Sequence, residues 1–287
     1  MTACNRVSRA KSSPLFPNAW MNARDFFDLS IADKVEVAMP WSGYPYGYSP
    51  LAGETLTRSL GLVGSPDLKE SFAIGPVDRP THDIVDPDES FAWSANLWPA
   101  ALTTFRASWE EYFRAMADLS ARLLRIMAQA LQMPSTWFDP LIDRHTSAMR
   151  ALNYPVPDHI LPGQMGAGAH TDYGTLTVLF ADPVEGGLQV QGIDDVWHDV
   201  QPMAGAFVVN LGDAMARWTN DRWRSTMHRV VVPQRRRQSI AFFHNANWDA
   251  RIECLPSCLT AGDSPRYSPI EAGPHLMAKF RSTVNPS

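Results

Sequence analysis

The sequence predicts a mostly β protein in which helices from the front half of the chain support strands from the back half. Over residues 104–132 the apolar side chains recur at three- and four-residue steps, which is the period of a helix. After about residue 147 the period falls to two, and short apolar runs alternate with clusters of Gly, Asp, Asn and Pro. Many short strands at close spacing favour an antiparallel sandwich, jelly roll or barrel.

The composition is that of an ordinary globular chain with a small-molecule partner. The 287 residues are 45% hydrophobic and 19% charged, which suffices for one large core or two modest ones. A formal net charge of -5 argues against a nucleic-acid-binding surface. No stretch approaches the roughly 18 apolar residues that a membrane span requires. We therefore expect neither nucleic acid nor membrane as a partner.

The cysteines indicate a reducing compartment. Cys4, Cys254 and Cys258 cannot all pair with one another, and they do not form the even-numbered framework of a small secreted domain. Two nearby cysteines without a second pair are also a poor zinc site. We expect a cytoplasmic protein with ordinary thiols.

Two helical regions are predicted in the front half. The stretch "MNARDFFDLSIADKVEVAM" is helical in two pieces, and Ser30 and Asp33 are spaced as a capping pair for the second. The segment "PWSGYPYGYSPLAGE" that follows has the composition of a loop. The long helix over 104–132 carries a continuous apolar stripe and is followed by Pro134.

Six strands are predicted in the back half, namely "SAMRALNY", "TLTVLF", "GLQVQ", "AFVVNL", "TMHRVVV" and "RQSIAFFH". The glycines of "GQMGAGAH" do not have the order of a dinucleotide-binding turn, and no helix is expected after them.

A histidine and an aspartate one residue apart begin the segment "HTDYGTLTVLF". In a strand, alternate residues face the same side, so His170 and Asp172 would project together. His228 lies on a later predicted strand. Two imidazoles and one carboxylate form the facial set that binds Fe(II) and leaves positions open for substrate and O2. We interpret these three residues as metal ligands and as catalytic residues.

A second pair of polar residues follows nine positions after His228. In "RQS", Arg237 and Ser239 share one face of a predicted strand with Ala241 and Phe243. A guanidinium offers two parallel donors to a carboxylate, and the hydroxyl can add a third. This pair is interpreted as a carboxylate receptor, whereas Arg235 and Arg236 fit a solvated turn.

These motifs together resemble the isopenicillin N synthase-like group of Fe(II)/2-oxoglutarate dioxygenases. The resemblance rests on H-x-D, a distant His followed by R-x-S, "NYP", "GGLQV", "FVVNLGD" and "WTND", and covers roughly residues 20–265. It implies a double-stranded β-helix, or jelly roll, with helices packed on one sheet. It also implies that the H-x-D pair and His228 are iron ligands and that Arg237 and Ser239 hold the distal carboxylate of 2-oxoglutarate. Tyr154 matches a tyrosine that contacts this co-substrate.

The substrate residues are less specific. Arg150 shares the face of Tyr154 by alternation, so its side chain either enters the site or lies exposed on the strand. Tyr173, Phe243 and Asn245 are candidate pocket walls because they neighbour the metal and R-x-S motifs. None of these residues identifies the substrate.

The family's chemistry implies a reaction and leaves two alternatives. Fe(II), 2-oxoglutarate and O2 would oxidise a small metabolite, most often by hydroxylation, and yield succinate and CO2. Desaturation and cyclisation are other outcomes, whereas Asp172 argues against halogenation. One alternative is an oxidase like isopenicillin N synthase itself, in which R-x-S grips substrate and 2-oxoglutarate is not used. The other is a binding protein that has lost turnover.

The front of the chain departs from the family pattern. The family's initial strand resembling I-P-x-I-D and its G-H-G turn are both missing. We therefore expect residues 1–19 to be disordered and foreign to the fold, 20–146 to be a truncated helical region, and 147–287 to be the catalytic core with a C-terminal segment. The missing strands should leave an unpaired sheet edge and an apolar patch.

Overall fold

The computed structural model describes residues 5–7, 15–41, 43–78, 80, 83–183, 186–201, 203–260 and 262–284. The front half contains β1 (Asn5–Val7), α1 (Leu15–Asp28), α2 (Ile31–Val35), β2 (Gly47–Ser49), η1 (Leu56–Leu60), β3 (Glu70–Ile74), α3 (Pro87–Ala92), α4 (Phe105–Ala130) and η2 (Asp139–Leu141). The back half contains β4 (Ala148–Tyr154), β5 (Ala167–His170), β6 (Leu176–Ala181), β7 (Leu188–Gln191), β8 (Trp197–Asp199), β9 (Phe207–Leu211), α5 (Asp213–Trp218), β10 (His228–Val230), β11 (Arg237–His244), β12 (Arg251–Ile252), η3 (Pro256–Cys258), β13 (Ile270–Glu271) and α6 (Ala272–Val284).

Two antiparallel sheets form the jelly roll that the sequence predicts. The larger has seven strands in the order β1-β9-β6-β11-β4-β3-β2, and the smaller has four in the order β5-β10-β7-β8. All six strands predicted for the back half are present, within one or two residues of the expected bounds. Among the described residues, no helix has the length and apolar character needed to cross a membrane.

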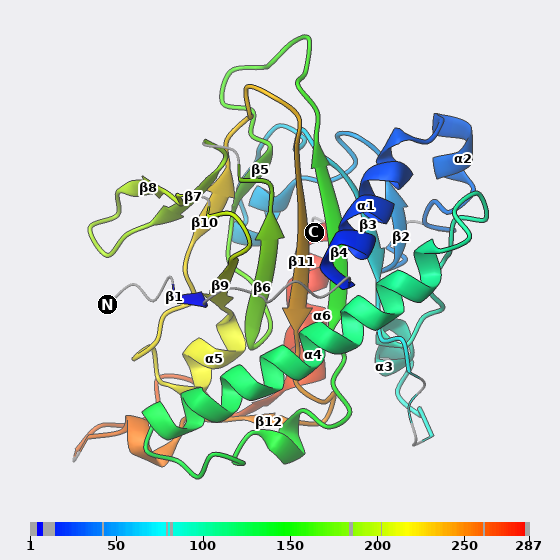
Figure 1. The fold of residues 1–287 in the computed structure, drawn as a ribbon. Coiled ribbons are helices and arrows are strands. Elements are labelled where there is room, and N and C mark those ends of the chain that lie inside the picture. The colour runs from blue at the N-terminus through cyan, green and yellow to red at the C-terminus, as the bar shows by residue number, and fades with distance from the viewer. Residues whose placement is uncertain are drawn as a thin grey trace.

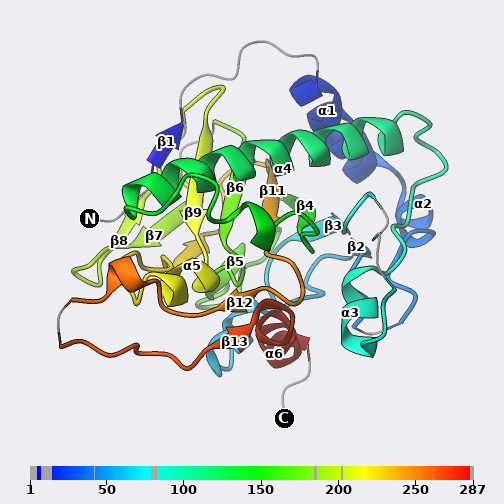
Figure 2. The ribbon, with the colours of Figure 1, turned by 90° about the horizontal axis from the view of Figure 1, so that it is seen from below.

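Helix α4 covers the outer face of the larger sheet, as its apolar stripe predicts. Figure 1 shows α4 crossing the larger sheet beside α1, and Figure 2 shows α6 on the opposite side of the molecule. Trp109 and Phe113 on the inner face of α4 are buried, and the ring of Phe113 meets that of Phe242 of β11 edge-on at 5.0 Å. The core of the protein therefore lies between this helix and the sheet.

The short helices α2 and α3 begin at recognisable capping residues. The Ser30 hydroxyl caps α2 by accepting from the backbone N–H of Asp33, as the sequence indicates. In α3, Asp86 is the cap and Pro87 takes the first position, where its missing N–H costs nothing.

The structure corrects two expectations for the front of the chain. The region expected to be only helical also contributes β2 and β3, and β3 pairs with β4 along five residues of the larger sheet. Residues 5–7, expected to be disordered, form β1 and pair with β9, so this edge of β9 is covered. Helix α1 begins at Leu15, inside the segment expected to be disordered. Residues 1–4 and 8–14, with Cys4 among them, lie outside the described part of the chain.

We expect the stability of the fold to depend on the buried face of α4 and not on its exposed face. Phe113→Ala should lower the free energy of unfolding by about 3–5 kcal/mol, because it removes a buried aromatic ring and leaves a cavity. Ile126→Ala, on the 62% exposed opposite face of the same helix, should change it by less than about 0.5 kcal/mol. Urea unfolding of both variants measures the difference, and equal losses would contradict this account of the core.

Candidate active site

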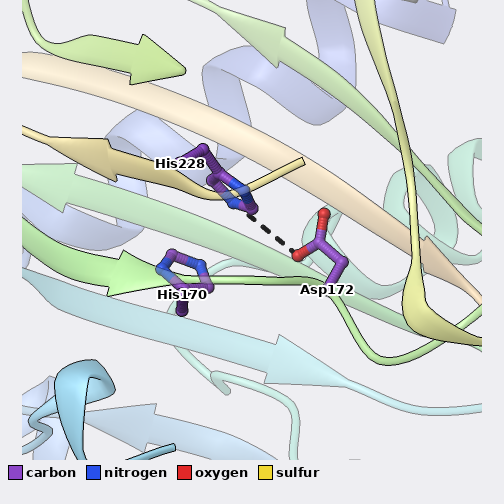
Figure 3. A group of neighbouring side chains, drawn as sticks. All are labelled: His170, Asp172 and His228. Carbon is purple, nitrogen blue, oxygen red and sulfur yellow. Dashed lines mark ion pairs between the residues drawn. The ribbon is translucent and has the colours of Figure 1, made fainter. Parts of the chain in front are cut away.

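Three side chains with ligating atoms converge inside the jelly roll. His170 ends β5 and His228 begins β10, and the two residues are direct partners in the antiparallel register of these strands. Their ring centroids lie 4.2 Å apart, and Nε2 of His228 is 3.8 Å from Oδ1 of Asp172. Figure 3 shows both imidazoles and the carboxylate facing one another. One ligand atom of each residue lies within 4.8 Å of the others.

His170 and Asp172 lie close together for a reason that differs from the expected one. Strand β5 ends at His170, so Asp172 lies in the turn that follows and does not share a strand face with the histidine. The turn is fixed by α5, because the N–H of Asp213 donates to the carbonyl of Asp172 at 2.8 Å. The Thr171 hydroxyl also donates to the Asp213 carboxylate, at 3.3 Å.

Backbone carbonyls orient both imidazoles. Nδ1 of His170 lies 2.7 Å from the carbonyl oxygen of Gly168, and Nδ1 of His228 lies 3.0 Å from that of Thr226. A carbonyl can only accept, so Nδ1 is the protonated nitrogen in the neutral form of each ring, and Nε2 is the nitrogen that could bind a metal. This arrangement is typical of metal-binding histidines.

Asn210 is a site residue that the sequence reasoning missed. Its side-chain amide donates to Oδ2 of Asp172 at 2.8 Å and so holds the carboxylate in place. Asn210 lies within the motif "FVVNLGD", which resembles the family pattern but does not by itself indicate a role for the asparagine. Its place on β9, whose alternate residues face the other sheet, is the signal that could have singled it out.

The electrostatics leave the site ready for a cation. Burial, reinforced by the neighbouring His228, lowers the pKa of His170 to about 3, so this imidazole is neutral near pH 7. Burial alone would raise the pKa of Asp172, but the imidazoles of His228 and His170 and the hydrogen bond from Asn210 outweigh it, and the net pKa is lowered. An ionised carboxylate and an unprotonated imidazole with Nε2 turned inward fit a divalent iron ion.

Arg237 and Tyr154 form a second polar cluster in the same cavity. The two residues are partners in the register of β11 and β4, and the guanidinium lies 5.3 Å from the Tyr154 ring centroid. The Tyr154 hydroxyl shares a hydrogen bond with Ser239, and burial raises the pKa of Tyr154 so that this hydroxyl stays protonated. Arg237 is only 3% exposed. A buried cation beside a hydroxyl donor is suited to a carboxylate ligand.

Gly187 lets the backbone approach this arginine closely. Its φ of +129° is a conformation that side chains rarely adopt, and an added Cβ would lie 3.3 Å from Cδ of Arg237. The "GGLQV" motif thus has a local physical reason in the packing of Arg237.

Every candidate site residue from the sequence lines one cavity of ≈ 1220 Å³ between the two sheets. The side chains of Arg150 and Asn245 already donate hydrogen bonds to other groups of the protein. Nη1 of Arg150 donates to both carboxylate oxygens of Glu54 at 2.9 Å, and Nδ2 of Asn245 donates to the carbonyl of Thr146 at 2.9 Å. Tyr173 packs 5.9 Å from the ammonium of Lys279 on α6, while Phe243 follows Ala241 along the inner face of β11.

Comparison with known proteins gives consistent results. Residues 146–246 match the model of the 2OG-Fe(II) oxygenase superfamily. The chain is 36% identical to the 2-oxoglutarate-Fe(II) type oxidoreductase hxnY of Emericella nidulans, over 86% of this chain and 71% of that protein. It is 34% identical to the proline hydroxylase buaE of Petromyces alliaceus, over 87% and 78% of the two chains.

Solved structures share the fold over nearly the whole chain. A full-length Neurospora crassa protein, solved in complex with alpha-KG, is 32% identical, with a TM-score of 0.81, over 95% of this chain and 84% of that one. A 2OG-Fe(II) oxygenase family protein from Caulobacter crescentus gives a TM-score of 0.80 at 30% identity, over 94% of this chain and 86% of that one. The chain therefore belongs to the 2OG-Fe(II) oxygenase superfamily and is an Fe(II)- and 2-oxoglutarate-dependent dioxygenase.

Proposed function

We propose that this dioxygenase oxidises a small metabolite in the cavity between its two sheets, most often by hydroxylation. In this proposal His170, Asp172 and His228 hold Fe(II), and Arg237 with Ser239 and Tyr154 holds 2-oxoglutarate. The observation that carries it is the presence, in one cavity, of a three-ligand cluster and a buried arginine. A dicarboxylate such as 2-oxoglutarate could bind the metal with one end and the arginine with the other.

The residues of the chain would bind and orient the reactants. Asp172 would neutralise part of the metal charge, and Asn210 would keep its second oxygen from turning away. Arg237 would pair with the distal carboxylate of 2-oxoglutarate, with Ser239 and the protonated Tyr154 hydroxyl as further donors. When bound, the iron would supply the redox chemistry with O2 that couples decarboxylation of 2-oxoglutarate to oxidation of the substrate.

The walls of the cavity would position the substrate and keep water away. We assign substrate contacts to Arg150, Tyr173, Phe243 and Asn245, which line the cavity beside the metal and arginine clusters. Residues 147–287 would form the catalytic core and residues 20–146 its support. We also propose a cytoplasmic location, which the free thiols of Cys254 and Cys258 support.

Iron binding should depend on all three ligands. His170→Ala, Asp172→Ala and His228→Ala should each abolish succinate release, because the metal loses one of its few protein bonds. His159→Ala, at an exposed position, is the matched control and should behave as the wild type. Anaerobic Fe(II) titration with bound-metal analysis, followed by a succinate assay, measures both properties. Full activity in any of the three ligand variants would refute the assignment.

Arg237 should act on 2-oxoglutarate and not on iron. Removing one side of a buried ion pair costs about 3–5 kcal/mol, and about 1.4 kcal/mol corresponds to a factor of ten. Arg237→Ala should therefore weaken 2-oxoglutarate binding by roughly two to three decades while iron content holds. Arg235→Ala, on an exposed neighbour, should change neither. If Arg237→Ala keeps its affinity for 2-oxoglutarate and loses substrate binding, the oxidase alternative applies.

A further inference from the structure

Four charged side chains, two positive and two negative, lie together at the wall of the cavity. Arg150 of β4 donates to both oxygens of Glu54, and the ammonium of Lys69 lies 3.2 Å from Oε2 of the same carboxylate. Lys69 also pairs with Asp67 at 2.8 Å, and both of these side chains are 2% exposed. Two cations therefore face two carboxylates, and the cluster as a whole is neutral.

The charges in this cluster persist over the ordinary pH range. Burial alone would raise the pKa of Glu54, but Arg150 and Lys69 outweigh it and lower that pKa to about 2. Burial alone would lower the pKa of Lys69, but Glu54 and Asp67 outweigh it and raise it. Near neutral pH a ligand therefore meets fixed ion pairs and not an unpaired cation.

The other cations on the described lining do not alter this balance at the wall. Besides Lys69 and Arg150, the lining contains Arg58 and Arg237. Arg58 is exposed, so solvent and salt screen its charge. Arg237 is the buried cation assigned above to 2-oxoglutarate. Besides Glu54, the carboxylates on the described lining are Asp172, assigned above to iron, and Asp194, which is exposed. A substrate with a net charge of either sign would therefore lose its hydration in this cavity without a buried counter-charge of its own.

Arg150 and Glu54 retain capacity for a neutral polar group. Within the described residues, only Nη1 of Arg150 has a hydrogen-bond partner, which leaves Nε and Nη2 as donors beside the cavity. The Glu54 carboxylate has more lone pairs than its contacts use. A group that carries a carbonyl and an N–H or O–H side by side matches this adjacent donor and acceptor.

The cavity is large, and aromatic side chains form part of its lining. A cavity of ≈ 1220 Å³ exceeds the roughly 300–1,000 Å³ that usually accommodates one drug-sized ligand. Trp41 and Tyr44 line it with ring centroids 4.7 Å apart, and so do Phe91 of α3 and Phe280 of α6, also at 4.7 Å. Such surfaces favour the faces and edges of planar rings.

We propose that the substrate is an uncharged molecule with a planar, largely apolar body and an amide-like polar group that binds at the Glu54–Arg150 pair. This inference rests on the proposed function of the same cavity and adds the chemical class of its substrate. Glu54 is the residue that sets the preference, because it cancels the charge of an arginine that would otherwise select a carboxylate.

The test compares two ligands of one shape, 2-naphthylacetamide and 2-naphthylacetate. Each is titrated calorimetrically into the full chain loaded anaerobically with Mn(II) and 2-oxoglutarate. The wild type should bind the amide at least tenfold more tightly than the acetate. Tighter binding of the acetate, or no saturable binding of the amide in the low millimolar range, would overturn the proposal.

Glu54→Gln separates charge from shape. This variant keeps the size of the side chain and leaves Arg150 unpaired, so the preference should move at least tenfold toward the acetate. Arg150→Gln should weaken the amide without strengthening the acetate. Glu253→Gln, which breaks the exposed ion pair with Arg251 at 2.7 Å, is the matched control and should leave the wild-type preference unchanged. An unchanged preference in Glu54→Gln would refute the role of this carboxylate.

A separate titration of 2-oxoglutarate into the Mn(II)-loaded chain, without either naphthyl ligand, distinguishes failure of the proposed function from failure of the substrate class. If the wild type fails to bind 2-oxoglutarate, the proposed function itself fails. If the wild type binds 2-oxoglutarate and prefers the acetate, only the substrate class is wrong. Wild-type affinity for 2-oxoglutarate in Glu54→Gln shows that the variant cavity is intact, and if that variant does not fold, the wild type and Arg150→Gln still decide the outcome.

Discussion

The antiparallel pairing of β5 with β10 is the contact on which the site depends. It sets His170 directly opposite His228, and the turn after β5 then brings the carboxylate of Asp172 to the same point. A shift of this register by one residue would turn one imidazole to the other face of the sheet. The pairing of β11 with β4 does the same for Arg237 and Tyr154 on the larger sheet. Two registers thus define two clusters, and the packing of the sheets fixes the gap between them.

Burial of polar groups imposes a second constraint on the interior. Each ionised or hydrogen-bonding group there needs a partner, because an unpaired one would destabilise the fold. Gly168, Thr226 and Asn210 are the hydrogen-bond partners of His170, His228 and Asp172, respectively. Asp67 and Glu54 are the ion-pair partners of Lys69. The same contacts that stabilise these groups also orient them, so stability and chemical readiness have a common cause in this cavity.

The sequence alone predicts those parts of the structure that depend on local pattern. Alternation along "RQSIAFFH" places Arg237 and Ser239 on one face, and β11 confirms the strand. The stripe over 104–132 predicts α4 and its buried side. By contrast, the Glu54–Arg150 contact joins residues 96 positions apart, and Glu54 lies in a loop whose sequence fixes no direction for the side chain. The pairing of β3 with β4 and of β1 with β9 likewise depends on long-range packing that no short window contains.

The loop position of Glu54 bears on how such enzymes diverge. Glu54 lies between β2 and η1 and belongs to neither sheet, whereas His170, His228 and Arg237 lie at the ends of strands. A substitution at this position changes the charge that a ligand meets without altering a core strand, and Asp67 remains as a partner for the buried Lys69 ammonium. Selection for a new metabolite can therefore act on one loop codon while the catalytic scaffold is inherited unchanged.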